Sequence, residues 1–552
     1  MNRRYGLVAL ALAVLTTVLL AIGHRDVGYV RDEGIYFEAS RRYAAWVAAV
    51  TTGDGEVGDQ RARDRAFAVN HEHPVLMKTL AGLSARAFAH APVADEDPET
   101  AGVWPVMPEG AAMRLPAQIL AGLGVGLLFL VGATWAGPWA GAVAAGGFIL
   151  LPRVAFHAGL HAFDVPIAVA MLIVVLAYRR SLRSWRWGLA LGPLLGLAVA
   201  TKHNALFLGP LLSLHYWACL AWGSLRDGKP VTRGQLVPLP LLSMAILGPL
   251  VAWALWPWMW SDTIARLSDY FDFHRQHSWY NTEFFGTNYN QPPMPVAYPW
   301  VMTWATVPTT LLLLTVTGLG AGLRDDVARP RSSDAAAGSF RVPLPEGWAR
   351  MDGGLLAMMT LFPLVLISLP GTPIFGGTKH WITAYPFASL AAGIGLVRLW
   401  DAAGLGRRAR RWMPVAVAVV LGPAAIGTLR GHPHNLSQYA PLVGGPRGAA
   451  DLGLQRGFWG YDVRTLLPAL ANARSVYLHD VHELARHQYA REGDWPPNVP
   501  AAPASRAPAG LLFYEKHMLI YEIDLWQQHG TAPAQVVSIH DVPTASLYQR
   551  TP

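Results

Sequence analysis

The stretch RLPAQILAGLGVGLLFLVGATWA, residues 114–136, decides the class of fold because it holds no acidic or basic side chain after Arg114. About 20 consecutive apolar residues are enough for a helix to cross the ~30 Å hydrocarbon core of a bilayer. Similar segments recur along the chain and predict a polytopic α-helical membrane protein with about eleven transmembrane helices. The segments lie at residues 5–23, 114–136, 138–152, 164–178, 187–201, 203–223, 234–258, 298–318, 354–370, 381–399 and 412–430.

The composition agrees with a membrane protein. Of the 552 residues, 52% are hydrophobic and only 14% are charged, whereas a soluble domain carries about 25% charged residues. These values exclude an ordinary soluble enzyme and an intrinsically disordered chain. The single cysteine, Cys219, lies in an apolar run, so neither an internal disulfide nor a thiolate metal cluster can form. The net charge of +8 comes largely from basic clusters beside apolar segments, which indicates membrane topology and not a nucleic-acid partner.

Lysine and arginine gather in alternate connections between the apolar segments. The rich connections are residues 179–186, 226–233, 324–350 and 398–411. Short cytoplasmic loops carry an excess of these residues. The pattern therefore predicts that the N-terminus lies inside the cell with these connections and that the C-terminus lies outside.

Three pieces on the outer side are too long to be simple connectors. They are the loops 24–113 and 259–297 and the tail from residue 431. The tail holds strand-like runs such as SVYLHD, GLLFYEKHMLIYEI and AQVVSIHDV, separated by helical and Pro/Ala-rich stretches. We therefore expect a membrane domain over residues 1–430 and a small extracytoplasmic α/β domain over residues 431–552.

The first candidate for chemistry is RDEGIYF, residues 31–37, directly after the first apolar segment. Asp32 and Glu33 are adjacent carboxylates beside Arg31, and Tyr36 follows within one helical turn. A carboxylate near apolar surface has a raised pKa, which suits it to remove a proton from a hydroxyl group. The alternative is a solvated loop whose acids cap a helix N-terminus.

The sequence VNHEHPVLMK, residues 69–78, offers a second candidate. His71 and Glu72, next to His73, could ligate a divalent metal ion if another loop completed the site. The alternative is a polar helix start with Pro74 at the first helical position. A possible divalent ion is the only cofactor that the sequence suggests, and none is required.

Two ionisable residues mark the ends of apolar segments. Asp164 begins one segment, and an ionisable residue at membrane depth is a functional candidate by default. Lys202 lies in the turn ATKHNA on the outer side, where a cation suits phosphate. The alternative is that both side chains reach into the headgroup layer.

The remaining outer loops add cations and hydrogen-bonding groups. A site assembled from these loops would bind an anion and offer a carboxylate base. The candidate residues are His274, Arg275, His277 and Tyr280 in the loop 259–297, and Lys379 and His380 in GTPIFGGTKHW.

The order of these motifs resembles a known family, the polyprenyl-phosphate-dependent glycosyltransferases of the GT-C superfamily, in the branch of the protein O-mannosyltransferases and the ArnT-like aminoarabinose transferases. Asp-Glu-Gly-x-Tyr at residues 32–36 is similar to the acidic motif of that family. HEHP at residues 71–74 resembles its His-Pro-Pro motif, with Val75 in place of the second proline and His73 where ArnT-type enzymes use a lysine. GGTKHWITAYPF and the stretch HNLSQYAPLVGGPRGAADLGLQRGFWG are similar as well.

The resemblance implies an inverting membrane glycosyltransferase. The donor would be a sugar on polyprenyl phosphate, and the acceptor a protein, lipid or glycan at the outer face of a bacterial inner membrane. Asp32 would be the base, Glu33 would orient the loop or bind the acceptor, and Asp164 would be a second positioning carboxylate. The substrate-binding residues would be Arg31, Tyr36, His73, Lys202, His274, Arg275, His277, Tyr280, Lys379 and His380. At least two of Lys202, Arg275 and Lys379 are expected beside Asp32, where they would neutralise the leaving phosphate.

Two other classes of protein fit parts of the sequence. A transporter of a lipid-linked or anionic substrate would explain the many spans, but it would place its charged or broken helices near the bilayer midplane. A non-catalytic scaffold that binds partners through its tail would leave the Asp-Glu motif without a role.

Overall fold

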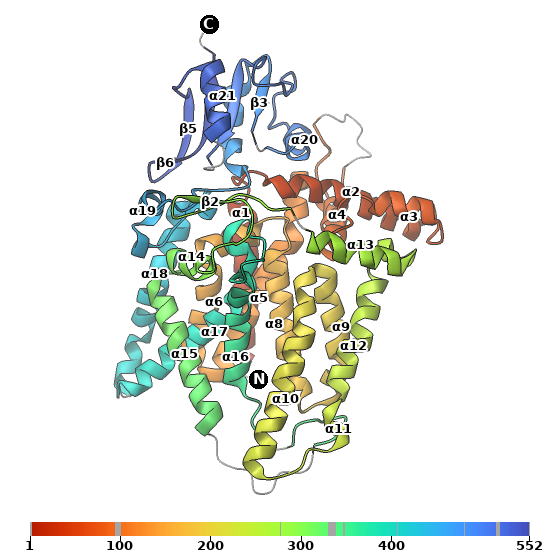
Figure 1. Cartoon of the computed structure of the whole chain (residues 1–552), viewed down its shortest axis with the longest axis vertical. Coiled ribbons are helices and arrows are strands. Elements are labelled where there is room, and N and C mark those ends of the chain that lie inside the picture. Colours follow the sequence, from red (N-terminus) through yellow and green to blue (C-terminus); the bar gives the residue numbers. More distant parts are fainter. Residues whose placement is uncertain are drawn as a thin grey trace.

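The computed structural model of the chain describes residues 3–93, 101–276, 278–328, 338–345, 348–405, 407–479, 481–514 and 519–550. Long helices form a bundle, and a small sheet lies beyond one end of it (Figure 1). The bundle helices are α1 (Arg3–Gly23), α5 (Glu109–Ala136), α6 (Pro138–Ile149), α8 (Asp164–Ser181), α9 (Trp185–Thr201), α10 (Leu208–Asp227), α12 (Leu239–Ala254), α15 (Thr309–Ala328), α16 (Asp352–Ile367), α17 (Tyr385–Ala402) and α18 (Met413–Gly431). Each predicted apolar segment overlaps one of these helices.

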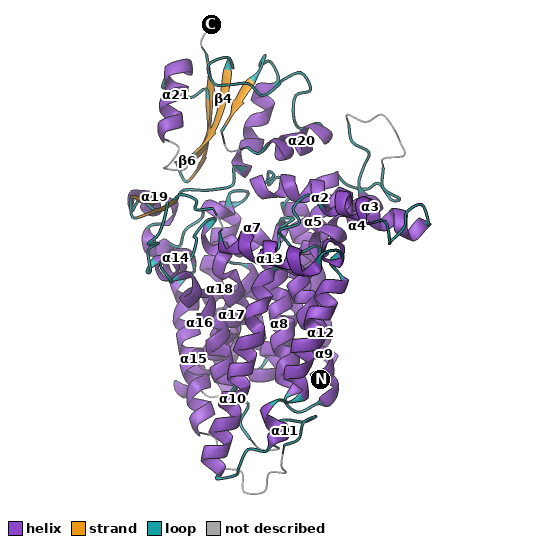
Figure 2. Cartoon of the chain, turned by 45° about the vertical axis from the view of Figure 1, so that its right-hand side comes forward, coloured by secondary structure: helices purple, strands orange, loops and turns teal. Residues whose placement is uncertain are grey.

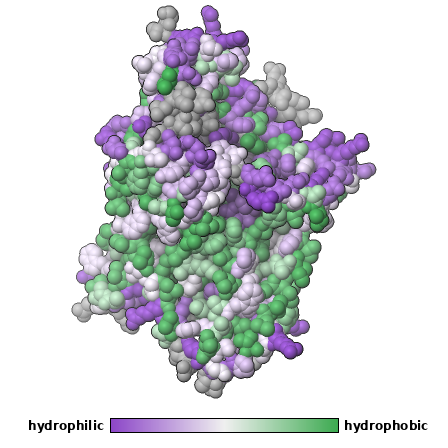
Figure 3. Space-filling model, in the orientation of Figure 1, coloured by the Kyte–Doolittle hydropathy of each residue, from purple (hydrophilic) through white to green (hydrophobic). Residues whose placement is uncertain are grey.

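The surface of the bundle is that of an integral membrane protein. Figure 3 shows one face of the molecule. On this face, hydrophobic residues cover the bundle, and hydrophilic residues gather toward its two ends. Leu7, Leu10 and Leu15 of α1, for example, are each more than half exposed. Among the described residues, five helices are long and apolar enough to cross a bilayer, or up to seven if two bent pairs each count as one span. The prediction of a polytopic α-helical membrane protein is confirmed, whereas the count of about eleven spans is not.

Proline breaks two of the predicted spans. The segment 298–318 is not one straight helix, because α14 (Tyr298–Thr306) and α15 meet at an angle of 119°. Val307 before Pro308 is extended, with ψ of 132°, since a residue that precedes proline avoids helical angles. In the segment 138–152 the helix α6 likewise ends at Ile149. Helix α7 (Pro152–Gly159) begins at the proline and is turned by 69° from α6.

The extramembrane elements gather at one end of the bundle (Figures 1 and 2). These are α2 (Arg31–Thr52), α3 (Gln60–Phe67), α4 (Leu76–Phe88), α13 (Thr263–Arg275), α19 (Gly445–Asp451) and the hairpin of β1 (Thr282–Phe284) and β2 (Thr287–Tyr289). Helix α11 (Arg233–Leu236) lies at the opposite end. Short 3-10 turns join the helices: η2 (His203–Phe207), η3 (Pro257–Trp260), η4 (Gly377–Ala384), η5 (Arg407–Trp412), η6 (Asn435–Ser437), η7 (Pro441–Val443) and η8 (Tyr461–Leu470).

The C-terminal part is a small α/β unit, as predicted. Its sheet has the order β3-β4-β6-β5, in which β3 and β4 are parallel and the other pairs antiparallel. The run GLLFYEKHMLIYEI does not form a single strand but divides between β4 and α21, and β6 was not predicted. The elements are β3 (Val476–Leu478), α20 (Glu483–Arg491), β4 (Ala509–Phe513), α21 (Leu519–His529), β5 (Gln535–Ile539) and β6 (Val542–Gln549).

Cysteine labelling tests the orientation of the bundle. Arg233 begins α11 and Arg474 lies two residues before β3, both are exposed, and these two elements lie at opposite ends of the molecule (Figure 1). The native Cys219 is buried and gives little background. In intact cells, a membrane-impermeant maleimide is expected to modify the Arg474→Cys variant and to spare the Arg233→Cys variant. Equal labelling of the two variants from outside would contradict the orientation.

Candidate active site

Asp32 lies in the first turn of α2, between two cations. The Nζ atom of Lys379 is 3.7 Å from Asp32 Oδ2, and Arg31 Nε is 3.7 Å from Asp32 Oδ1. The Lys379 side chain is 8% exposed and that of Asp32 is 26% exposed. Lys379 Nζ also lies 4.1 Å from the ring centre of Trp459, which is a cation–π contact. The lysine is therefore largely shielded from water, while the carboxylate stays accessible.

A second carboxylate–lysine pair stands close by. Asp164 begins α8, and its Oδ1 accepts a hydrogen bond of 2.7 Å from the Nζ of Lys202, which directly follows α9. Asp164 Oδ2 lies 3.5 Å from Nδ1 of the buried His157 in α7.

Tyr36 and Trp459 link the two pairs. Burial, followed by the charges of Asp32, Asp164 and Glu72, raises the pKa of the Tyr36 phenol well above its usual value. Besides its contact with Lys379, the Trp459 ring lies 5.4 Å from the ring of His157. Two of the three cations that were expected near Asp32 thus lie in one region, and they are Lys202 and Lys379. We call this region the carboxylate–lysine site.

Arg275, the third of the expected cations, does not pair with Asp32 or Asp164 in the described part of the chain. Its side chain is 76% exposed and pairs with Asp272 at 2.8 Å, one helical turn earlier in α13. Tyr280 lies near the site, with the Arg31 guanidinium 5.6 Å from its ring centre. The His380 ring instead contacts the backbone of Phe375 in its own loop. His277 lies outside the described residues.

Glu33 has a different role from that of its neighbour Asp32. Its side chain is fully buried, and Oε1 and Oε2 accept bonds of 2.8 and 2.6 Å from Nε and Nη2 of Arg114 in α5. Oε1 also accepts from the backbone N–H of His161, and Oε2 from that of Val30. Glu33 therefore orients this part of the chain; the expectation that it binds the acceptor does not fit, because no part of its side chain is exposed.

Arg114 completes this buried network. Its remaining N–H groups donate to the backbone carbonyls of His24, Val27 and Gly28 at 2.9–3.0 Å. The segment that leads from α1 into α2 is thereby fixed against α5, and Asp32 is positioned by groups that do not contact it.

The C-terminal part also holds the acidic motif in place. The backbone N–H of Arg31 donates to the carbonyl of Trp459 at 2.9 Å, and Trp459 has a positive φ of 77°. A side chain at Gly34 would begin only 2.4 Å from the backbone N of Ala485 in α20. The glycine of the motif is thus required by the close approach of α2 and α20.

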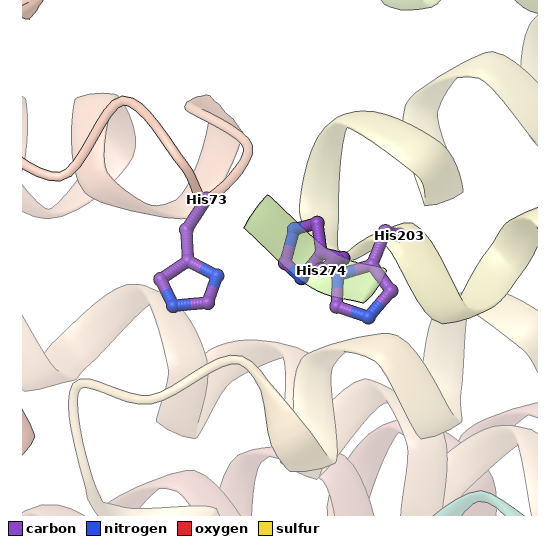
Figure 4. A group of neighbouring side chains, drawn as sticks. All are labelled: His73, His203 and His274. Atoms are coloured by element: carbon purple, nitrogen blue, oxygen red, sulfur yellow. The ribbon is translucent and has the colours of Figure 1, made fainter. Parts of the chain in front are cut away.

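The HEHP motif is divided by the fold. His71 is 47% exposed and stacks on Trp258 at 4.5 Å, while the Glu72 side chain accepts a bond from Asn70. His71 Nδ1 lies 4.0 Å from Glu72 Oε2, and the metal pair of these two residues stays a prediction. His73 joins His203 and His274, and one ring nitrogen from each lies within 4.8 Å of the others (Figure 4).

Two groups near this cluster have strongly shifted pKa values. Burial, followed by the charge of Lys78, lowers the pKa of His73 well below its usual value. Burial lowers the pKa of Lys78 itself to about 7, against the opposing effect of Glu72. Lys78 Nζ donates to the carbonyls of Asn70 and His73 at 2.6 and 2.9 Å, which fixes the loop before α4.

Sequence reasoning missed several groups around these residues. Arg114 could have been singled out as the one basic residue within a long apolar segment. Trp459 lies in GFWG, a stretch whose resemblance to the family was noted without a role for the tryptophan. His157 was not missed, because it recurs at helical spacing with His161 shortly before Asp164, but its contact with Asp164 became clear only in the fold.

Comparison with known proteins supports the resemblance. Residues 60–228 match the family model of dolichyl-phosphate-mannose-protein mannosyltransferases. This confirms, over that part of the chain, the resemblance inferred from the motifs. The matched stretch includes Asp164 and Lys202 but neither Asp32 nor Lys379.

Two solved structures are similar over almost the whole chain. Both are of ArnT from Cupriavidus metallidurans. The structure bound to undecaprenyl phosphate has 14% identity, covers 99% of this chain and 98% of that chain, and has a TM-score of 0.47. The apo structure has 16% identity, covers 98% of this chain and 97% of that chain, and has the same TM-score of 0.47. No curated protein sequence matches the chain.

Proposed function

We propose that the chain is an inverting glycosyltransferase that moves a sugar from polyprenyl phosphate to the hydroxyl group of a protein, lipid or glycan. The observation that carries this proposal is the carboxylate–lysine site. An accessible carboxylate, Asp32, stands 3.7 Å from the shielded cation Lys379, and the second pair of Asp164 and Lys202 adjoins them. The mannosyltransferase family match supports the same class of reaction.

Asp32 serves as the general base in this reaction. Its carboxylate takes the proton of the acceptor hydroxyl while the acceptor oxygen forms a bond to the anomeric carbon. The bond from that carbon to the phosphate oxygen breaks at the same time, and polyprenyl phosphate departs with the electron pair. Arg31 and Lys379 pair with the ionised form of Asp32, which is the form that accepts a proton.

Lys379 and Lys202 bind the departing phosphate. Cations held in a site that excludes water stabilise developing charge far better than exposed cations do. Asp164 pairs with Lys202 and so positions its ammonium group. We assign Asp164 this positioning role because its own oxygens already face Lys202 and His157.

An apolar cavity supplies a place for the lipid tail of the donor. A cavity of about 150 Å³ lies between α6 and the helices α14–α17, lined by side chains such as Trp304, Leu312 and Leu361. Its wall includes Ala384 at the end of η4, the element that carries Lys379. This supports a donor whose tail lies among the helices while its phosphate reaches the lysines.

The positions of the charged pairs favour an enzyme over a transporter. Asp164 begins α8 and Lys202 follows α9, so both lie at helix ends and not in the middle of a span. A transporter would bind its substrate near the midplane. The Arg-rich connection 179–186 joins the opposite ends of α8 and α9, and the connection 226–233 follows α10. This supports a site on the extracytoplasmic face, which in a bacterium is that of the inner membrane.

Binding of polyprenyl phosphate tests the phosphate site without knowledge of the sugar. The Lys202→Ala and Lys379→Ala variants are each expected to bind it about 10–100-fold more weakly than the wild type, because each loses a hydrogen bond between charged groups. Native mass spectrometry of the purified protein, titrated with polyprenyl phosphate, measures the affinity. The matched control is Arg275→Ala, which removes an exposed cation outside the site and should leave binding unchanged. A wild type that retains no polyprenyl phosphate, or lysine variants that bind it as tightly, would contradict the proposal.

A further inference from the structure

We propose that a cavity beside the C-terminal end of α18 binds the headgroup of an anionic bilayer phospholipid of the phosphatidylglycerol type. We call it the α18 cavity. Its volume of about 490 Å³ falls within the range of about 300–1,000 Å³ that is usual for small-molecule sites. Its walls come from α18, the break between α14 and α15, the segment 438–446 and the turn between β5 and β6. The proposal does not rest on the reaction proposed above.

The α18 cavity opens on a surface that contacts lipid. Helix α18 lies in one of the segments long and apolar enough to cross a bilayer. Ile426, in the second half of this helix, is 52% exposed and lines the cavity. Much of the remaining wall is apolar, which suits the glycerol and upper acyl part of a lipid and not a free phosphate ion. Five prolines contribute to it: Pro152, Pro308, Pro423, Pro441 and Pro446.

Arg430 gives the cavity its positive charge. This residue lies in the last turn of α18, is exposed, and lines the cavity. None of the residues that line the cavity is acidic. A guanidinium without a carboxylate beside it suits the phosphate of a lipid headgroup. A zwitterionic headgroup would also bring an ammonium group, for which this wall offers no carboxylate.

Gln438 brings a hydrogen-bond acceptor that the protein leaves unused. Its side chain lines the cavity, and the residue is only 7% exposed. Its Oε1 is buried and has no hydrogen-bond partner among the described residues. Since buried polar atoms are nearly always paired, this oxygen points to a ligand with a hydroxyl group. A glycerol headgroup offers such hydroxyl groups next to the phosphate.

The turn between β5 and β6 adds a wall from the C-terminal part. His540 and Asp541 form this turn with positive φ values of 48° and 65°, and His540 lines the cavity. Such backbone angles cost energy in residues other than glycine and persist where the surroundings fix them. Arg447 of α19 does so, because it pairs with Asp541 and its Nε donates to the His540 carbonyl at 2.9 Å. A lipid in the cavity would therefore contact both the bundle and the C-terminal part.

The α18 cavity is distinct from the cavity assigned to the lipid tail of the donor. The two cavities share no lining residue. Val307 lines the donor cavity, whereas Thr306 and Pro308 line the α18 cavity. The backbone break between α14 and α15 thus separates them, and the two lipids can be tested separately.

Lipid titration of the purified full chain tests this site. The delipidated protein in detergent would be titrated with phosphatidylglycerol and, separately, with phosphatidylcholine of the same acyl chains, and followed by native mass spectrometry. The wild type should bind one phosphatidylglycerol at least about 5-fold more tightly than phosphatidylcholine, the effect of one basic residue on an anionic lipid. Arg430→Gln should weaken this binding about 10–100-fold, because it removes a hydrogen bond between charged groups. Arg430→Lys keeps the charge and should retain most of the affinity.

Arg25→Gln is the matched control. Arg25 is an exposed arginine two residues after α1, and it does not line the cavity. An arginine that merely extends into the headgroup layer would give the same small effect at either position. The control should therefore bind phosphatidylglycerol like the wild type.

Three results would overturn the proposal. One is equal binding of the two phospholipids by the wild type, a readout that requires no variant to fold. Another is an Arg430→Gln variant that binds phosphatidylglycerol as tightly as Arg25→Gln does, with the elution profile of the wild type in size-exclusion chromatography. The third is an Arg430→Gln variant that loses affinity for polyprenyl phosphate but not for phosphatidylglycerol, which would assign the cavity to the donor.

Discussion

Replacement of Asp32 by asparagine is expected to lower the rate of sugar transfer about 10²–10⁴-fold, the usual cost of losing a positioned general base. Asparagine has nearly the same shape but accepts no proton at neutral pH. The Asp32 side chain is 26% exposed, and its contacts with Arg31 and Lys379 are both 3.7 Å long, so the fold should survive. Initial rates of polyprenyl phosphate release, measured at equal amounts of folded protein, give the comparison.

Asp26 provides the matched control for this variant. It lies in the connection between α1 and α2, shortly before Asp32, its side chain is 77% exposed, and it pairs with His432 at 3.8 Å. Asp26→Asn makes the same chemical change outside the site and should leave the rate unchanged. If Asp32→Asn kept the wild-type rate, Asp32 would not be the base. Asp164 would then be the remaining candidate, because Glu33 is fully buried.

Replacement of Glu33 by glutamine is expected to destabilise the protein by about 3–5 kcal/mol, the cost of breaking a buried ion pair on one side. The guanidinium of Arg114, 2% exposed, would lose its carboxylate partner. The backbone N–H groups of Val30 and His161 would also compete for a single amide oxygen. The midpoint of thermal unfolding in detergent should fall strongly.

Glu38→Gln is the control in the same helix. Glu38 pairs with Arg41 and Arg42 at the protein surface, where an ion pair contributes only about 0–1 kcal/mol. Its unfolding midpoint should therefore stay close to that of the wild type. Equal midpoints for Glu33→Gln and Glu38→Gln would contradict the structural role of the buried pair.

The fold could be predicted from hydrophobicity to the extent that each apolar segment contains a helix. The breaks were harder to predict, because hydropathy continues through Pro308 and Pro152 while the backbone turns there. The C-terminal sheet was only partly visible. Its last strand, β6, pairs with both β4 and β5, and such pairing depends on distant parts of the chain.

The candidate site could be predicted as a set of residues but not as a geometry. The family-like motifs identified Asp32, Asp164, Lys202 and Lys379. The ion pair of Arg275 was available in the sequence, because Asp272 precedes it by one helical turn. By contrast, the partner of Glu33 is 81 residues away, and local sequence holds no signal for such a contact.

The histidine cluster shows the same limit. His73 and His203 lie far apart in the chain, and only the fold brings the ring of His274 in α13 near both of theirs. The sequence pattern HEHP favoured adjacent residues as joint ligands. In the fold, His73 lies instead with His203 and His274, a grouping for which the local sequence holds no signal.

The most direct test of the account is transfer from a defined donor. The purified wild type and the Asp32→Asn variant would be incubated with a panel of polyprenyl-phosphate sugars and with protein, lipid and glycan acceptors. The account predicts that the wild type releases polyprenyl phosphate from at least one donor, in equal amount to the glycosylated acceptor and with inverted configuration at the anomeric carbon. It also predicts that Asp32→Asn releases almost none. Release at equal rates by both proteins, or no release from any donor by folded wild type, would contradict it.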